Sequence, residues 1–376
     1  MGHAREVVGA ASLPRQFDLI ALGTGSAAAT VATACREAGW QVAVVDALPY
    51  GGTCALRGCD PKKVLVGAAE VVDWCRRVNG KGVRADHARI DWAELMRFKR
   101  SFTDPVPGSR EELFRRLGIA AFHGRARFSG PQSVEVRGET LSARHVVIAT
   151  GAKPRPLRIP GERLVITSDD FLELERLPEE MVFVGGGYIA FEFAHIAARA
   201  GVRATILHRG KRPLEQFDAE LVERLVEQTR KQGVDVRVNT PVTGVERLKD
   251  AYTVHTGLDG AAASVSTRLV VHAAGRQPDI EDLQLDAAGI EATSRGITVN
   301  GYLQSVSNGA AYAAGDSAAS GAPLTPVPVT TAASWRTTCS MATARSPTTR
   351  DWPAWCSPSR RSPLPASRKR PPPPAT

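Results

Sequence analysis

The chain has 376 residues, 43% of them hydrophobic, and its 48 lysines and arginines exceed its 39 aspartates and glutamates to give a formal charge of +9. This apolar content supports packed cores and excludes a wholly disordered chain, and the length suggests two or three domains. No apolar run reaches the roughly 18 residues of a spanning helix. The segment from Met1 to Arg15 lacks the long apolar stretch of a secretory signal. We therefore expect a cytoplasmic protein with no membrane partner.

Most of the positive charge lies at the C-terminal end. Residues 330–376 hold eight lysines and arginines and one acid, Asp351, so they carry +7 of the +9. They also hold nine of the 25 prolines and no valine, isoleucine or glycine. Such a segment has almost no aliphatic surface to bury and cannot offset its own ordering entropy. We interpret 330–376 as a basic Pro/Ser/Thr-rich tail, disordered or frameshifted, and expect no nucleic-acid partner.

The N-terminal part begins with a strand, glycine turn, helix and strand pattern. An apolar strand at 17–22 leads into the turn Gly23-Thr24-Gly25-Ser26-Ala27-Ala28. An alanine-rich helix follows to about Ala38, and a second apolar strand at 41–45 ends at Asp46. This arrangement is typical of the first half of a dinucleotide-binding fold.

The same pattern returns later in the chain. A strand at 181–184 precedes Gly185-Gly186-Gly187-Tyr188-Ile189-Ala190, and a second strand at 204–207 ends at His208 and Arg209. In such units the first glycine makes the tight turn, the second admits a pyrophosphate, and the third small residue packs helix on strand. Two complete copies predict two dinucleotide sites.

The strand ends differ between the copies. Asp46 can accept hydrogen bonds from a ribose diol, whereas a basic end at His208 and Arg209, with Lys211 and Arg212 behind it, suits a 2′-phosphate. The second site therefore favours NADPH over NADH, with a solvated basic loop as the alternative.

A cysteine pair follows the first unit closely. Cys54 and Cys59 stand in a C-x4-C spacing, eight residues after Asp46, and lead into a helical stretch with Lys62 nearby. A thiol near a helix N-terminus and beside a lysine has a lowered pKa and is reactive. Alone, the spacing also fits two buried small residues. After a nucleotide unit, in a chain without an export signal, it predicts a redox-active pair.

These residues resemble the class I pyridine nucleotide-disulfide oxidoreductases, which include glutathione reductase, dihydrolipoamide dehydrogenase and mercuric reductase. The resemblance covers residues 15–328 and includes Ala149-Thr150-Gly151, Ala273-Ala274-Gly275-Arg276 and Ala314-Gly315-Asp316. Within the family, Arg57-Gly58-Cys59-Asp60-Pro61-Lys62-Lys63 is most similar to glutathione reductases.

The resemblance implies FAD and NADPH as cofactors, and electron flow from NADPH through the flavin to a Cys54–Cys59 disulfide and on to a small disulfide substrate. Cys59 would be the charge-transfer thiol and Cys54 the interchange thiol. Lys62, with Lys63 as the one-position alternative, would pair with Glu192 near the flavin. The implied cofactor-binding residues are Gly23, Gly25, Ala28, Asp46, Gly52, Thr53, Ala126, Thr150, Gly151, Gly185, Gly187, Tyr188, Ile189, Arg209, Arg276, Gly315 and Asp316.

The implied fold class is α/β, with two Rossmann-like dinucleotide-binding domains and the NAD(P) domain inserted in the FAD domain. The expected FAD domain comprises 15–160 and 285–329, the expected NAD(P)H domain comprises 161–284, and 330–376 form the tail. No metal-ligand spacing occurs in the sequence, so we expect no metal.

One part of the family pattern has no counterpart. Family members are homodimers whose interface domain supplies a histidine, followed five residues later by a glutamate, to the partner's site. The last histidine here is His272, and the resemblance stops abruptly after Val327. A frameshift accounts for this best, and a natural basic arm for nucleic acid or membrane is the alternative. We expect poor dimerisation and slow turnover.

The sequence leaves the substrate open. Glutathione reductases usually carry an arginine on the first helix, where this chain has Thr33 with Arg36 as the only base nearby. The alternatives are a dihydrolipoamide-dehydrogenase-like or mercuric-reductase-like member, or a truncated FAD/NADPH-binding fragment without full turnover.

Overall fold

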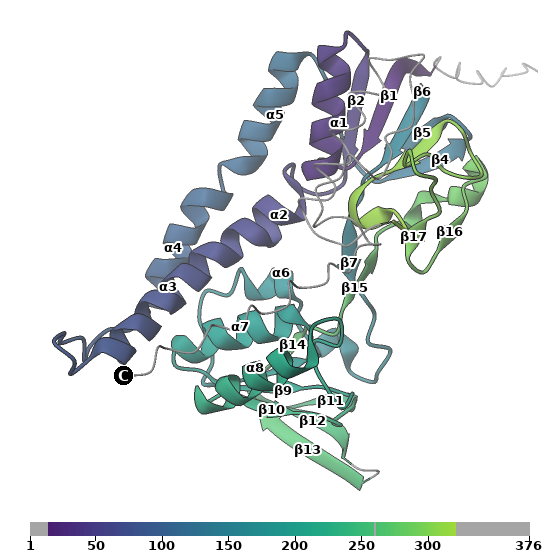
Figure 1. Cartoon of the computed structure of the whole chain (residues 1–376). Helices are drawn as coiled ribbons and strands as arrows, with labels where there is room; N and C mark the ends of the chain where they lie inside the picture. The colour runs from purple at the N-terminus through teal and green to yellow at the C-terminus, as the bar shows by residue number, and fades with distance from the viewer. Residues whose placement is uncertain (1–13, 259–260, 321–376) are drawn as a thin grey trace, which may run out of the picture.

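The computed structural model of the chain describes residues 14–258 and 261–320, and the predictions for the tail lie outside these residues. Two α/β units, each built on a largely parallel sheet, are joined by a narrow two-stranded ribbon (Figure 1). The ribbon consists of β7 (Ala152–Pro154) and β15 (Arg276–Pro278), which pair antiparallel. We call it the crossing ribbon.

The first unit contains a seven-stranded sheet in the order β3-β2-β1-β6-β5-β4, with β18 beside β6. Its strands are β1 (Arg15–Leu22), β2 (Val42–Asp46), β3 (Ala120–His123), β4 (Ala126–Gly130), β5 (Ser133–Val136), β6 (Glu139–Ile148) and β18 (Ala311–Ala313). The neighbours β3, β2, β1, β6 and β18 run parallel, while β4 and β5 form an antiparallel extension. Both faces of β1 and β2 are buried, as their continuous apolar sequences require.

The register of this sheet positions the site. Leu22 at the end of β1 is opposite Val45 in β2 and Ile148 in β6, and Ile148 is opposite Ala313 in β18. The carboxyl ends of four parallel strands therefore share one edge. Ligands of open α/β sheets bind at such an edge.

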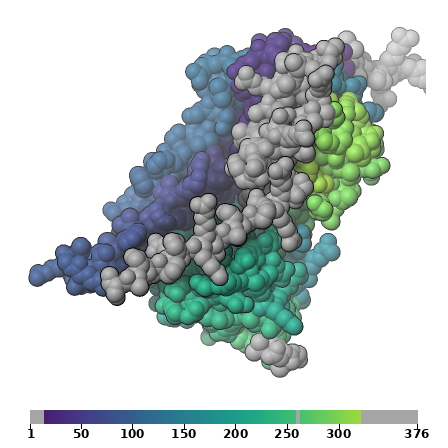
Figure 2. All heavy atoms as spheres, in the orientation of Figure 1, coloured from purple at the N-terminus to yellow at the C-terminus, as the bar shows by residue number. Residues whose placement is uncertain are grey.

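The helices of the first unit are α1 (Ser26–Glu37), α2 (Gly52–Arg57), α3 (Cys59–Val78), α4 (Trp92–Thr103) and α5 (Val106–Leu117). The α3 and α4 helices extend away from the sheet and rest on the second unit (Figures 1 and 2). Leu65, Trp92 and Met96 pack in one core with Phe171 and Phe193 of the second unit. The two units therefore share a hydrophobic core.

The second unit contains a parallel sheet in the order β10-β9-β8-β14, followed by an antiparallel meander of β11, β12 and β13. Its elements are η1 (Glu162–Leu164), α6 (Ser168–Phe171), β8 (Glu180–Val184), α7 (Tyr188–Arg199), β9 (Arg203–Leu207), α8 (Ala219–Lys231), β10 (Asp235–Arg237), β11 (Val242–Leu248), β12 (Ala251–Leu258), β13 (Ala261–Thr267) and β14 (Leu269–His272).

After β15 the chain returns to the first unit. The returning segment comprises η2 (Glu281–Leu283), η3 (Leu285–Ala288), β16 (Ala292–Thr293), β17 (Gly296–Ile297), β18 and η4 (Gly315–Ser317). Ile280 and Leu283 already belong to the core of the first unit. No helix within the described ranges combines the length and apolar character that crossing a membrane requires.

Candidate active site

The first glycine turn closes against the neighbouring strand. Gly23 has a φ of 114°, and a Cβ atom there would lie 2.4 Å from the carbonyl oxygen of Ala149. Only glycine fits this approach. The turn then delivers the chain to α1, whose N-cap, Gly25, provides no side-chain hydrogen bond. The first amides of α1 therefore face the shared edge of the sheet without a side-chain cap, as an anion-binding helix N-terminus requires. Ala28 is fully buried and packs the helix on the sheet.

The carboxylate of Asp46 is oriented by its neighbours. Its Oδ2 accepts hydrogen bonds from the amide and hydroxyl of Thr24 at 2.9 and 2.6 Å, and its Oδ1 accepts one from the amide of Leu48 at 3.0 Å. The Thr24 hydroxyl also accepts a hydrogen bond from the amide of Gly51. Thr24 thus links the glycine turn, the end of β2 and the cysteine segment, and the motif alone did not identify it.

The cysteine segment is packed backbone to backbone against the glycine turn. Gly52 has a φ of +74°, and a Cβ atom there would lie 2.4 Å from the Cα of Gly25. Between the cysteines the helix breaks at Gly58, where a Cβ would lie 2.9 Å from the Thr53 carbonyl oxygen. This break ends α2 after Arg57 and starts α3 at Cys59.

A cross-unit ion pair lies one helical turn beyond Cys59. The Lys62 Nζ lies 2.8 Å from Oε1 and 2.9 Å from Oε2 of Glu192 on α7. Lys63, the alternative, is exposed. The ion pair joins α3 of the first unit to α7 of the second.

One cavity of about 400 Å³ collects most of the predicted residues. Its lining includes Gly23, Gly25, Asp46, Gly52, Thr53, Cys54, Cys59, Lys62, Ala126, Thr150, Gly151, Tyr188, Ile189, Glu192, Arg276, Gly315 and Asp316. Four predicted residues do not line it: Ala28, Gly185, Gly187 and Arg209. The first is buried beneath the turn, and the other three belong to the second glycine turn and its strand end.

The cavity contains polar groups suited to a ligand. The Thr150 hydroxyl is buried and has no hydrogen-bond partner among the described residues. Burial raises the pKa of Asp316, although the Arg276 charge opposes this shift. A buried donor without a partner is costly. The Thr150 hydroxyl and the uncapped start of α1 therefore fit a polar, anionic group such as the diphosphate and ring edge of FAD.

The second glycine turn repeats the design of the first. A Cβ at Gly185 would lie 2.2 Å from the Ala273 carbonyl oxygen, whereas among the described residues, chain neighbours aside, no heavy atom comes within 4 Å of a Cβ at Gly187. Space at Gly187, directly before α7, leaves room for a pyrophosphate. Tyr188 begins α7, is 52% exposed and lines the cavity of the first unit. Its side chain thus lies where the two nucleotide units meet.

The end of β9 exposes fewer basic side chains than the sequence indicated. His208 turns inward: a Cβ at Gly186 would lie 2.4 Å from its Nδ1, and its Nε2 lies 2.9 Å from the Arg212 carbonyl oxygen. Burial lowers its pKa below the ordinary value. Arg209 and Lys211 are exposed at this end.

Charged residues that were not predicted as site residues also line the cavity. Arg57 and Asp169 form one ion pair, Arg125 and Asp282 another, and Lys153 Nζ lies 3.1 Å from Asp279. Each pair joins segments far apart in the sequence. No local pattern could have identified them.

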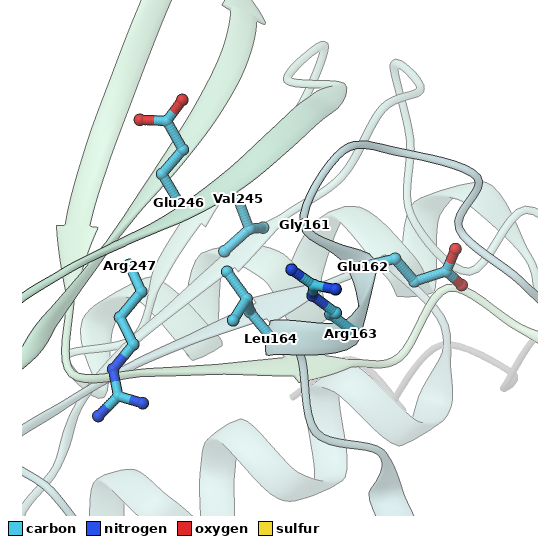
Figure 3. Close-up of a pocket in the computed structure, with 7 residues that line it drawn as sticks. All are labelled: Gly161, Glu162, Arg163, Leu164, Val245, Glu246 and Arg247. Atoms are coloured by element: carbon cyan, nitrogen blue, oxygen red, sulfur yellow. The ribbon is translucent and has the colours of Figure 1, made fainter.

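A larger, shallow hollow lies between η1 and β11, away from the cysteines. Figure 3 shows Val245 and Leu164 facing one another, while the charged ends of Glu246 and Arg247 point in different directions. Because its polar groups do not converge, this hollow lacks the features of a specific ligand site.

Two Rossmann-like units that share a cavity with a C-x4-C pair define the architecture of a flavoprotein disulfide reductase. The chain belongs to the pyridine nucleotide-disulphide oxidoreductase family, whose model matches residues 17–338. The predicted fold class is thereby confirmed.

Three curated relatives illustrate the breadth of this family. The chain is 36% identical to glutathione reductase of Burkholderia cepacia over 301 residues, which are 80% of this chain and 66% of the relative. It is 32% identical to dihydrolipoyl dehydrogenase of Thermus scotoductus, covering 80% and 66%. It is 30% identical to mercuric reductase of Staphylococcus aureus, covering 80% and 55%. The chain thus spans between half and two thirds of the length of these relatives.

A solved structure supports the same family. The Cu(II) complex of the HOCl-induced flavoprotein disulfide reductase RclA from Escherichia coli is similar, with a TM-score of 0.76 and 25% identity. The similarity covers 85% of this chain and 70% of that one.

Proposed function

We propose that this chain is an FAD-dependent oxidoreductase that takes electrons from NADPH, passes them to the Cys54–Cys59 pair and delivers them to a small disulfide substrate, in the manner of a glutathione reductase. One observation carries the proposal. Both cysteines, the Lys62–Glu192 ion pair and Tyr188 line the same cavity as the first glycine turn. The nicotinamide of NADPH, the flavin of FAD and the two thiols would then meet in one cavity.

FAD would lie along the first unit. Gly23, Gly25 and Ala28 would form the turn and helix start at its diphosphate, and Asp46 would accept from its ribose. The rest of the FAD molecule would contact Thr53, Ala126 and the Thr150 hydroxyl, together with Gly52, Gly151, Gly315 and Asp316. When bound, FAD supplies the two-electron chemistry that protein side chains lack. Lys62 would hold positive charge beside it, oriented by Glu192.

NADPH would lie along the second unit. Gly185, Gly187 and Ile189 would contact its pyrophosphate, and Tyr188 would cover the nicotinamide position. Arg209 would bind the 2′-phosphate, with Lys211 as a second cation. NADH remains the alternative, since the His208 ring lies inward with its Nε2 hydrogen-bonded to the Arg212 carbonyl oxygen. The proposed division places the FAD domain at 15–160 and 285–329 and the NADPH domain at 161–284.

The thiol chemistry would follow in two steps. Reduction of the pair would leave Cys59 facing the flavin position and Cys54 facing the substrate. The Cys54 thiolate would then attack one sulfur of the substrate disulfide, release the other half as a thiol and form a mixed disulfide that Cys59 resolves. The leaving thiol needs a proton. The described residues that line the cavity include no histidine, so we propose that the release of this thiol is slow.

The identity of the disulfide is a separate proposal. The guanidinium of Arg36 is already hydrogen-bonded to the backbone. Its Nε donates to the Leu117 carbonyl at 2.7 Å, and its Nη1 donates to the Trp40 carbonyl at 3.1 Å. It caps the end of α5 and is not available to a glutathione carboxylate. A dihydrolipoamide-dehydrogenase-like or mercuric-reductase-like preference therefore stands as the alternative. Poor dimerisation, a cytoplasmic location and the absence of nucleic-acid or membrane partners remain predictions from the sequence.

The test starts from the purified chain and its visible spectrum. Under anaerobic conditions, NADPH should bleach the flavin bands and produce a long-wavelength charge-transfer band. Cys59→Ser should remove that band while FAD remains bound, and Cys54→Ser should retain it. NADH at the same concentration is the control for nucleotide choice. A chain that binds FAD and is not reduced by either nucleotide would establish the alternative, a binding fragment. A chain that holds no FAD would refute both.

A further inference from the structure

We propose that Asp169 is a positioning residue that links the cysteine helix α2 to the crossing ribbon through two arginines, Arg57 and Arg276. The structural part of this inference stands on the contacts alone. Its kinetic part rests on the proposed function. The three side chains line the main cavity, and neither the glycine motifs nor the C-x4-C pair includes Asp169.

The first contact connects Asp169 to the cysteine helix. Arg57 is the last residue of α2 and stands between the two cysteines in the sequence. Its Nε lies 3.4 Å from Oδ2 of Asp169, which belongs to α6 of the second unit. Their side chains are 20% and 29% exposed. A pair this shielded is screened less by salt than a surface pair, so it holds α2 more firmly.

The second contact connects Asp169 to the crossing ribbon. Oδ1 of Asp169 lies 3.8 Å from Nη1 of Arg276, the first residue of β15, whose side chain is 18% exposed. Arg276 also donates to the carbonyl of Ala152 in β7, so it binds both strands of the ribbon. Its charge acts on Tyr188, whose pKa burial raises and Arg276 lowers. Asp169 is therefore one carboxylate shared by two arginines.

Other charged pairs also cross between the units but reach different places. Lys62–Glu192 and Asp73–Arg199 join α3 to α7 at two points along that helix. Neither touches α2, the helix that carries Cys54. The Asp169 link acts on α2 and on the ribbon together. Without this carboxylate, two cations would face one another in a half-buried space, and their repulsion would separate α2 from the ribbon.

The consequence is a coupling between the relative position of the two units and that of the interchange cysteine. With Asp169 in place, Tyr188 on α7 and Cys54 on α2 keep a fixed spacing across the cavity. A neutral residue at 169 would loosen that spacing and leave the cysteines and both glycine turns chemically intact. The effect would therefore appear in local mobility and in the transfer of electrons between the units.

The test compares Asp169→Asn with Asp169→Glu and with a matched control, Asp170→Asn, in the full-length protein. Asp170 is the next residue of α6, and its carboxylate accepts from the amide and hydroxyl of Thr167 in a capping box without contacting either arginine. The rate of backbone hydrogen exchange should rise about fivefold at 52–57 and 276–278 in Asp169→Asn. This is the change expected when an ion pair that stabilises the closed state of these segments about fivefold is lost. Asp169→Glu should restore the exchange, and Asp170→Asn should affect α6 alone.

The kinetic readout is the rate of anaerobic flavin reduction by NADPH. It should fall about fivefold in Asp169→Asn, depend less on salt than in the wild type, and recover in Asp169→Glu. Unchanged exchange at both segments in Asp169→Asn, or an equal rise in Asp170→Asn, would overturn the inference. If exchange changes as expected while NADPH fails to reduce even the wild type, the positioning role stands and the proposed function fails.

Discussion

The contact between Gly25 and Gly52 yields the sharpest prediction, because the two glycines differ in what a methyl group would meet. In Gly52→Ala the new Cβ would lie 2.4 Å from the Gly25 Cα, against 3.6 Å for the reverse substitution. Gly52 also has a φ of +74°. The left-handed conformation costs an alanine about 1–2 kcal/mol, and the forced backbone shift adds about 1–3 kcal/mol. We therefore expect a loss of about 2–5 kcal/mol of unfolding free energy.

Thermal unfolding followed by circular dichroism measures this loss. Gly52→Ala should lower the Tm by about 5–15 °C and release FAD. Gly25→Ala should cost at most about 1 kcal/mol, yet weaken FAD binding, because its methyl group would face the uncapped start of α1. Gly67→Ala is the control: it lies in α3, and beyond the backbone of that helix no described residue comes within 4 Å of the new Cβ. This substitution should stabilise the chain by up to about 1 kcal/mol. A Tm for Gly52→Ala equal to that of Gly25→Ala would refute the argument.

Three further predictions concern buried polar groups. Tyr50→Phe should stabilise the chain by up to about 1 kcal/mol in urea unfolding, because the buried Tyr50 hydroxyl has no hydrogen-bond partner within the described part of the chain; a large loss would show that the hydroxyl is bonded. Asp46→Asn should cost about 1.5–3 kcal/mol and weaken FAD binding, since its carboxylate accepts two hydrogen bonds from Thr24. Burial lowers the pKa of His195 from 6.5 to about 4. The contribution of the neutral ring to the free energy of unfolding is therefore fully present above pH 6.5, and up to about 3 kcal/mol of it is lost as the pH falls toward 4. His195→Gln should flatten that part of the stability profile, and an unchanged slope would contradict the assignment.

The sequence predicted the nucleotide units well because their determinants are local. The expected strand at 17–22 is β1, and the helix expected to end near Ala38 is α1, which ends at Glu37. In the second unit, the strand expected at 204–207 is β9, which spans Arg203–Leu207. A glycine turn between an apolar strand and an alanine-rich helix defines each element by its own residues.

Features that depend on tertiary contacts were not predictable in this way. The core shared by Trp92 and Met96 with Phe171 arises where α4 meets the second unit, and no sequence period marks a contact between separate elements. His208 shows the same limit. Its position at a strand end suggested an exposed cation, but the missing side chain of Gly186 allows its ring to lie inward.

Some residues of the candidate site could be predicted from local sequence, and others could not. Gly23, Thr150 and Asp316 are far apart in the sequence, yet each follows a parallel strand, and the register of β1, β6 and β18 brings those strand ends together. A motif at the end of a parallel strand can therefore be placed by rule. The charges that hold the second unit against the cysteines follow no such rule, because each joins elements of different units. In this chain these charges include Asp169 and Glu192, and they act together with the Lys99–Glu173 pair and the shared hydrophobic core.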